Sequence, residues 1–226
     1  CGIAHFTMRG FIKVDTATDY QAWQDSLPTF AQTLNKNMAN IELGKQHYAT
    51  CISCHGSEAQ GLEVMNAPKL AGLSRWYLHR QLSYFKGQIR GRNNDDSYGQ
   101  QMAAMAALLP DDKAIEDVSA YLNSLPELDK TSKGSGDLSK GKTFYKNCAY
   151  CHGDGAQGNF SMNAPKLAGQ HTWYLKRQIS HYQQGIRGSH PADLYGKQMI
   201  LMSKTLSDEH AVNDVVSYIN SLGNLR

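Results

Sequence analysis

Two short motifs place cysteine and histidine side chains at a spacing that suits one kind of cofactor. Residues 51–55 read Cys-Ile-Ser-Cys-His, and residues 148–152 read Cys-Ala-Tyr-Cys-His. Two thiols separated by two residues, with a histidine directly after the second, are typical of covalent haem attachment. A disulfide within each motif is the alternative, which the histidine in both copies disfavours. The predicted thioether residues are Cys51, Cys54, Cys148 and Cys151, and the predicted iron ligands are His55 and His152.

The motifs lie in an internal repeat with an offset of 97 residues. Residues 40–125 align with 137–222 without a gap, and roughly half of the positions are identical. Such a repeat predicts two copies of one fold, each with its own haem. We expect haem domains at 36–128 and 140–226, joined by a short polar linker at 129–139.

Apolar residues inside each repeat recur at helical spacing, so we expect a mainly α fold. A third helix should follow Leu-Pro-Asp-Asp in the first repeat and Leu-Ser-Asp-Glu in the second, where Ser207 is the predicted N-cap. The predicted helices cover about 41–51, 76–87 and a segment after 112 in the first repeat, and about 138–148, 173–184 and a segment after 209 in the second.

Charge is distributed unevenly over a chain whose net charge is only +3. Residues 1–128 hold 11 Lys/Arg and 13 Asp/Glu, whereas residues 129–226 hold 12 and 7. This difference could orient a docking partner, or it could reflect scattered solvated charges. We expect no nucleic-acid partner. The chain also lacks the roughly 20 consecutive apolar residues that a membrane-spanning helix needs.

The second axial ligand decides whether such an iron carries electrons or binds substrate, and methionine favours the carrier. Each repeat has three methionines at matching places, although methionine is also a common core filler. The first of each set lies only ten residues past the histidine, too near to reach the opposite haem face. The three matching pairs are Met65 and Met162, Met102 and Met199, and Met105 and Met202.

The repeats resemble cytochrome c4-type, class I di-haem cytochromes. The resemblance rests on C-x-x-C-H-G, P-K-L-A-G, Y-L-x-R-Q and M-x-x-M. It implies two haem c groups and an electron-transfer function, with Met102 and Met199 as axial ligands and Met105 and Met202 as the nearest competitors. It also implies that the carbonyls of Pro68 and Pro165 accept the free ring N–H of each axial histidine.

Aromatic and basic side chains recur at helical spacing after these motifs. They could contact haem propionates, and ordinary core packing is the alternative. These residues are Tyr77, Arg80, Tyr174 and Arg177. Six histidines have no counterpart in the other repeat, and we expect them at the surface. They are His47, His79, His171, His181, His190 and His210.

Residues 1–35 lie outside the repeat and carry a different motif. Cys1, His5 and Met8 form C-x-x-x-H-x-x-M, a set suited to copper, and 11–14 alternates like a short strand. This segment resembles the end of cytochrome c oxidase subunit II, which implies a cupredoxin-like remnant and copper (CuA) ligands at those three residues. The first bridging cysteine is missing, so this chain alone cannot assemble the site. A lipidated Cys1 is the alternative.

Together these resemblances imply an electron-entry module of an oxidase. A bc1-type complex or a soluble cytochrome would reduce the haems, which would pass electrons to CuA and the remaining oxidase subunits. The module itself would not be an enzyme. It would lie on the periplasmic side of the bacterial inner membrane, tethered through a missing N-terminal part. The alternatives are a free or lipid-anchored c4-like shuttle and a di-haem peroxidase or thiosulfate dehydrogenase, which the identical methionine placement disfavours.

Overall fold

The computed structural model describes residues 14–27, 38–127 and 134–223. The chain divides into two compact units, Cys1–Met38 and Ala39–Arg226, so both repeats lie in one unit. In the first unit, Thr16 caps helix α1 (Ala17–Ser26) by accepting a hydrogen bond from the Asp19 N–H at 3.1 Å.

The described residues include no strand, only two isolated β-bridges. The predicted strand at 11–14 lies almost wholly outside the described ranges. The aromatic segment after it, with Tyr20 and Trp23, is helical. The described part of the N-terminal segment therefore provides no support for a cupredoxin remnant.

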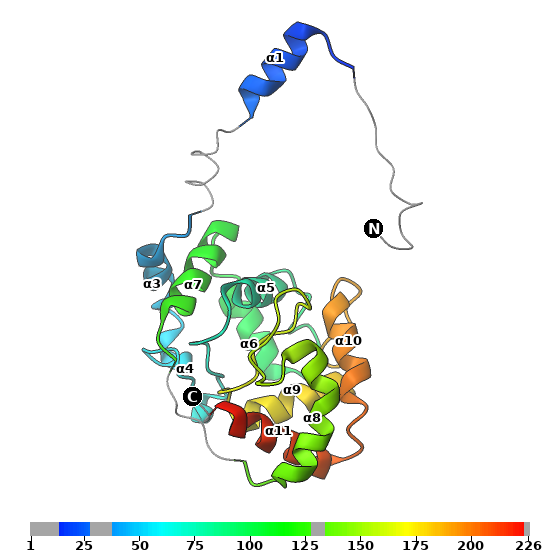
Figure 1. The fold of residues 1–226 in the computed structure, drawn as a ribbon. Coiled ribbons are helices and arrows are strands. Elements are labelled where there is room, and N and C mark those ends of the chain that lie inside the picture. The colour runs from blue at the N-terminus through cyan, green and yellow to red at the C-terminus, as the bar shows by residue number, and fades with distance from the viewer. Residues whose placement is uncertain (1–13, 28–37, 128–133, 224–226) are drawn as a thin grey trace. The chain divides into compact units, whose positions relative to one another are not determined.

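The α-helices of the two repeats follow the same order (Figure 1). The first repeat holds α3 (Ile41–Tyr48), α4 (Ile52–His55), α5 (Arg75–Lys86), α6 (Ser97–Ala106), α7 (Asp112–Ser124) and a short 3-10 helix, Glu63–Met65. The second holds α8 (Leu138–His152), α9 (Thr172–Gln183), α10 (Leu194–Ser203) and α11 (Glu209–Gly223). Helix α8 spans continuously what α3 and α4 divide between them. The mainly α prediction is confirmed for this part of the chain.

An aspartate side chain caps the last helix of each repeat. The Asp111 carboxylate accepts from the Ala114 N–H at 2.8 Å before α7, and Asp208 accepts from the Ala211 N–H at 2.9 Å before α11. The predicted N-cap, Ser207, is therefore wrong by one residue. The aspartate next along the chain accepts from the N–H of Ala211, the third residue of the helix, and such caps are among the most favourable.

Helices α6 and α10 were not predicted from the sequence. Each starts at an aspartate N-cap, Asp96 or Asp193, whose carboxylate accepts from a glycine N–H at 2.8 Å. A glycine and several polar residues in each helix weaken the apolar period on which sequence prediction depends. Helix formation here depends on packing: α6 contacts α5, and α10 contacts α9.

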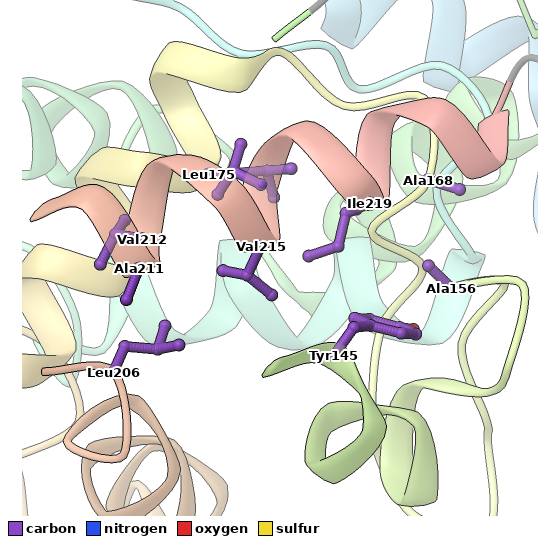
Figure 2. Packing of buried hydrophobic residues seen from close by; sticks show 10 residues of the cluster. Tyr145, Ala156, Ala168, Leu175, Leu206, Ala211, Val212, Val215 and Ile219 are labelled. Carbon is purple, nitrogen blue, oxygen red and sulfur yellow. The ribbon is translucent and has the colours of Figure 1, made fainter. Parts of the chain in front are cut away.

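In each repeat the core forms where the last helix crosses the first. Helix α7 packs on α3 and α11 packs on α8. Figure 2 shows Val215 and Ile219 of α11 on the side of the helix that faces Tyr145. Gly44 of α3 allows the crossing in the first repeat, because a Cβ there would collide with the carbonyl oxygen of Asp117. Gly141 has the same role in the second repeat.

Candidate haem-binding site

The C-x-x-C-H motifs lie on helical turns that direct thiols and imidazole to one cavity. Cys51, Cys54 and His55 come from the start and the body of α4, and their counterparts end α8. The four described cysteines form no disulfide, so the disulfide alternative is not realised. Burial raises the pKa of the Cys51 thiol and raises that of Cys148 to about 11. The surroundings of the two cysteines therefore do not stabilise a thiolate.

A backbone carbonyl orients each motif histidine. His55 Nδ1 lies 2.8 Å from the Pro68 carbonyl oxygen, and His152 Nδ1 lies 2.7 Å from that of Pro165. Because a carbonyl only accepts, Nδ1 must carry the hydrogen and Nε2 is left as a free lone-pair donor. Burial lowers the pKa of both imidazoles, partly offset by these hydrogen bonds. Each ring is held in the neutral form that ligates iron.

Tyrosines support the turn that follows each histidine. The buried Tyr48 hydroxyl donates to the Gly56 carbonyl at 2.7 Å, and Tyr145 donates to Gly153 at 2.6 Å. Burial raises the pKa of both phenols, so each remains a donor at every physiological pH. This bond ties the first helix of the repeat to the residue after the motif histidine.

A cavity of about 690 Å³ joins the two repeats, and the cysteines and histidines of both motifs line it. Its walls include apolar side chains of the helices that follow the motifs, such as Leu78, Phe85, Leu175 and Ile179. A large, flat, apolar group bound to the motif thiols fits such walls.

The candidate methionines all reach this cavity. Met102 on α6 and Met199 on α10 are half-buried, and Met102 packs against the cluster around Phe85. Met105 and Met202 also line the cavity, but each is 37% exposed. In both repeats the first methionine of M-x-x-M is thus less exposed than the second, which favours Met102 and Met199 as the iron ligands.

Two arginines at the junction of the repeats, the half-buried Arg90 and the buried Arg187, were missed by sequence reasoning. The Arg90 guanidinium donates to the Tyr174 hydroxyl at 3.0 Å and to Gln178 Oε1 at 2.9 Å. Its counterpart, Arg187, donates to the Tyr77 hydroxyl at 3.2 Å and to Gln81 Oε1 at 2.8 Å. The available signal was the triplet Ile-Arg-Gly, which recurs at 89–91 and 186–188.

These arginines fit the carboxylates of a haem. The Nε atoms of Arg90 and Arg187 are buried without a hydrogen-bond partner, and neither side chain forms an ion pair with a described carboxylate. A buried guanidinium is costly unless an anion pairs with it. Both side chains line the cavity that the motif cysteines line, so haem propionates would supply the missing anions.

Comparison with known proteins agrees with this geometry. A family model described as cytochrome c matches residues 41–126 and again 138–223. The chain belongs to the cytochrome c family. Each match contains one complete C-x-x-C-H motif and three candidate methionines.

Individual relatives place this cytochrome with the di-haem c4 type. The thiosulfate dehydrogenase electron acceptor of Stutzerimonas stutzeri is 29% identical over 184 residues, which cover 76% of this chain and 79% of that protein. Cytochrome c4 of Thiocapsa roseopersicina is 32% identical over 154 residues, 62% of this chain and 73% of that one. The crystal structure of reduced cytochrome c4 from Pseudomonas stutzeri superposes with a TM-score of 0.63 at 27% identity, covering 80% of this chain and 98% of that one. This cytochrome is thus a di-haem electron-transfer protein.

The residues predicted near the propionates lie at the junction between the repeats of the cytochrome. Tyr77 and Tyr174 accept from the two arginines described above. Arg80 and Arg177 instead donate across the junction to Asn163 and Asn66. All four predicted side chains line the cavity, so they also serve to join the repeats.

Two histidines expected at the surface of the cytochrome are part of the junction. His171 Nε2 lies 2.9 Å from the Gln60 carbonyl oxygen of the first repeat. His181 Nδ1 is buried and lies 3.9 Å from Asp96 Oδ1, with the side chain only 13% exposed. Helix α9 carries both towards the first repeat, which a single sequence does not reveal.

The predicted copper ligands Cys1, His5 and Met8 lie outside the described residues. Over 14–27, 38–127 and 134–223, no group of three His, Cys, Asp or Glu side chains could hold a metal ion. Within the same ranges, no helix is long and apolar enough to cross a membrane. The cytochrome c family match begins at residue 41, so nothing in these comparisons supports a fused oxidase subunit II segment.

Proposed function

We propose that this cytochrome is a periplasmic electron shuttle of the c4 type, rather than an attached part of an oxidase. The observation that carries the proposal is the duplicated site. Both repeats orient a neutral histidine on a proline carbonyl, with matching bonds of 2.8 and 2.7 Å. Each also directs a half-buried methionine to the cavity. Two equivalent sites suit transfer of electrons along one molecule.

The chain's own residues prepare each site. The cysteines would hold the haem covalently, and the buried imidazole would ligate its iron through Nε2. Met102 and Met199 would also ligate iron, because they are less exposed than Met105 and Met202 and Met102 packs against the Phe85 cluster. When bound, haem supplies reversible one-electron chemistry at iron. Arg90 and Arg187 supply positive charge where the two repeats meet.

The same symmetry argues against a di-haem enzyme. Such enzymes need one iron with an open or unusual axial position. In this chain the candidate ligands come from equivalent places on α6 and α10. Neither repeat is distinguished as the catalytic one. Because one relative is named as the electron acceptor of thiosulfate dehydrogenase, we propose a periplasmic dehydrogenase as one class of donor.

Axial-ligand variants of the holoprotein test this function. Met102→Ala and Met199→Ala should each convert one haem to a high-spin, ligand-binding form, seen in the oxidised absorption spectrum and by binding of cyanide or imidazole. Met105→Ala and Met202→Ala are the matched controls and should leave both irons low-spin. A wild-type protein with one high-spin iron would overturn the carrier function in favour of a di-haem enzyme.

The oxidase-attached alternative depends on Cys1, His5 and Met8 alone. It predicts a membrane-spanning hairpin and a further cysteine encoded immediately upstream. The shuttle predicts an export signal or a lipidation signal there. Reading the upstream coding sequence, and measuring the mass of the native N-terminus, distinguishes the two.

A further inference from the structure

The exposed face of α10 carries leucine and lysine, whereas the equivalent face of α6 carries small or uncharged polar residues. Four residues of α10 and its C-cap lie at i, i+3, i+7 and i+10, a spacing that puts them on one helix face. They are all exposed and read Leu194, Lys197, Leu201 and Lys204. We call them the α10 stripe. The matching exposed positions in the first repeat are Ser97, Gln100, Ala104 and Ala107.

The α10 stripe exposes two leucine side chains that do not contribute to the core of the fold. Leu194 is 63% exposed and Leu201 is 70% exposed. The first repeat forms the same helix with serine and alanine at these positions, so leucine is not needed for folding there. Apolar side chains close together on one helix face can form the centre of a protein-binding surface, with the lysines in its polar rim.

The α10 stripe also lies close to the second site. Met199 is on the opposite face of the same helix, and Met202, next to Leu201, lines the cavity. An α-helix with its side chains is about 10 Å across. A partner seated on the stripe is thus about one helix width from the Met199 face and from the cavity.

The net charges of the two repeats indicate that a partner of the second repeat is acidic. Residues 134–223 hold nine Lys/Arg and six Asp/Glu, whereas residues 39–127 hold eight and ten. The basic repeat is therefore the one that carries the stripe, and the first repeat is the acidic one. An acidic protein is attracted to the second repeat and repelled from the first, which steers it to one end of the molecule.

We infer that the α10 stripe is the docking surface for an acidic redox protein that presents carboxylates around an apolar centre, and that electrons exchange with partners through the second repeat. This inference rests on the proposed electron-transfer function. Lys197 and Lys204 steer the encounter, and Leu194 and Leu201 provide the apolar contact.

The test replaces the stripe with the residues of α6. The variant Leu194→Ser, Lys197→Gln, Leu201→Ala, Lys204→Ala is made in the holoprotein, and a plastocyanin-type cupredoxin with an acidic face is the probe. We expect about a tenfold weaker Kd by titration calorimetry and about a tenfold lower second-order electron-transfer rate constant at low ionic strength. The dependence of the rate on salt should also flatten.

Two matched variants control for charge alone and for position. Lys140→Gln with Lys142→Gln removes two exposed charges from α8 of the same repeat and should change both quantities less than twofold. Ser97→Leu, Gln100→Lys, Ala104→Leu, Ala107→Lys builds the stripe on α6 and should raise the rate. Unaltered circular dichroism and haem spectra confirm folding of every variant.

Three outcomes would overturn the inference. The stripe variant could bind the cupredoxin and transfer electrons as the wild type does. Alternatively, the α8 variant could lose as much affinity and rate as the stripe variant. Self-association of the wild type that the stripe variant abolishes, seen by analytical ultracentrifugation, would instead assign the face to a second copy of this chain. Failure of the proposed electron-transfer function is distinguishable from failure of this inference. In that case the wild type would exchange electrons neither with the cupredoxin nor with hexacyanoferrate.

Discussion

The guanidinium of Arg80 donates to both the backbone carbonyl and the side-chain oxygen of Asn163, at 3.0 and 3.2 Å. The reciprocal bonds run from Arg177 to Asn66 at 2.9 and 3.0 Å. Both asparagines are in the left-handed region, with φ of 54° and 53°, a conformation that asparagine tolerates better than most residues. The recurring Met-Asn-Ala-Pro block therefore presents a carbonyl to the opposite repeat. Two copies of one fold join through equivalent contacts.

Removing one of these arginines should loosen the junction. Arg80→Met leaves the Asn163 carbonyl without its donor, and hydrogen bonds from charged groups contribute about 2 kcal/mol. We expect the free energy of unfolding in guanidinium chloride to fall by about that amount. Arg92→Met is the control, because Arg92 is exposed. Equal unfolding midpoints for the two variants would contradict the structural role of Arg80.

The tyrosines behind the motif histidines should matter equally in both repeats. Tyr48→Phe and Tyr145→Phe each leave a buried glycine carbonyl unpaired, which costs about 1–3 kcal/mol. Thermal unfolding of the holoprotein measures the loss. Tyr150 is 83% exposed, so Tyr150→Phe should leave the midpoint unchanged. If Tyr150→Phe lowers the unfolding midpoint as much as the other two variants do, loss of a buried hydroxyl does not explain their destabilisation.

Arg90 and Arg187 should raise the reduction potentials of the haems. A nearby positive charge favours the reduced state, so Arg90→Met and Arg187→Met should each lower a midpoint potential by tens of millivolts, on the order of 1 kcal/mol. Arg187→Lys keeps the charge and should recover most of the shift. Spectroelectrochemical titration measures both potentials. An equal shift in the lysine variant would point to altered packing instead of charge.

Acidification should weaken the junction through His181. Burial lowers the pKa of this imidazole, the Asp96 carboxylate opposes that shift, and the cations of Arg177, Arg90 and Arg187 add to it. The unfolded chain therefore binds this proton at a higher pH than the folded chain does. Stability contributed by the neutral ring is present above pH 6.5 and is lost as the pH falls below that value.

The variant His181→Tyr isolates this effect, because Tyr84 occupies the equivalent position in the first repeat. Denaturant unfolding at pH 7 and at pH 5 should show a smaller loss of stability in the variant than in the wild type. His210→Gln, on an exposed residue of α11, serves as the control. Identical pH dependence in the wild type and both variants would rule out His181 as the sensitive group.

Sequence reasoning succeeded where the chemistry depends on neighbours along the chain. The C-x-x-C-H motif needs only one helical turn, and the gapless repeat required two similar folds. It failed for α6 and α10, whose helices depend on tertiary packing, and it misplaced one cap at Ser207. The resemblance of Cys1, His5 and Met8 to a copper motif covered too few residues to establish a second domain.

The amino-acid sequence by itself determined the number of haem sites, the motif histidines and the three pairs of candidate methionines, because covalent attachment is encoded locally. Only the tertiary structure decided how the two repeats join. Arg90, Arg187 and His181 are ordinary polar residues in the sequence. They become a partly buried junction because helix α9 and the segments that follow α5 and α9 bring them together. The same is true of the α10 stripe, since folding half-buries Met199 and leaves Leu201 exposed on the other side of the helix.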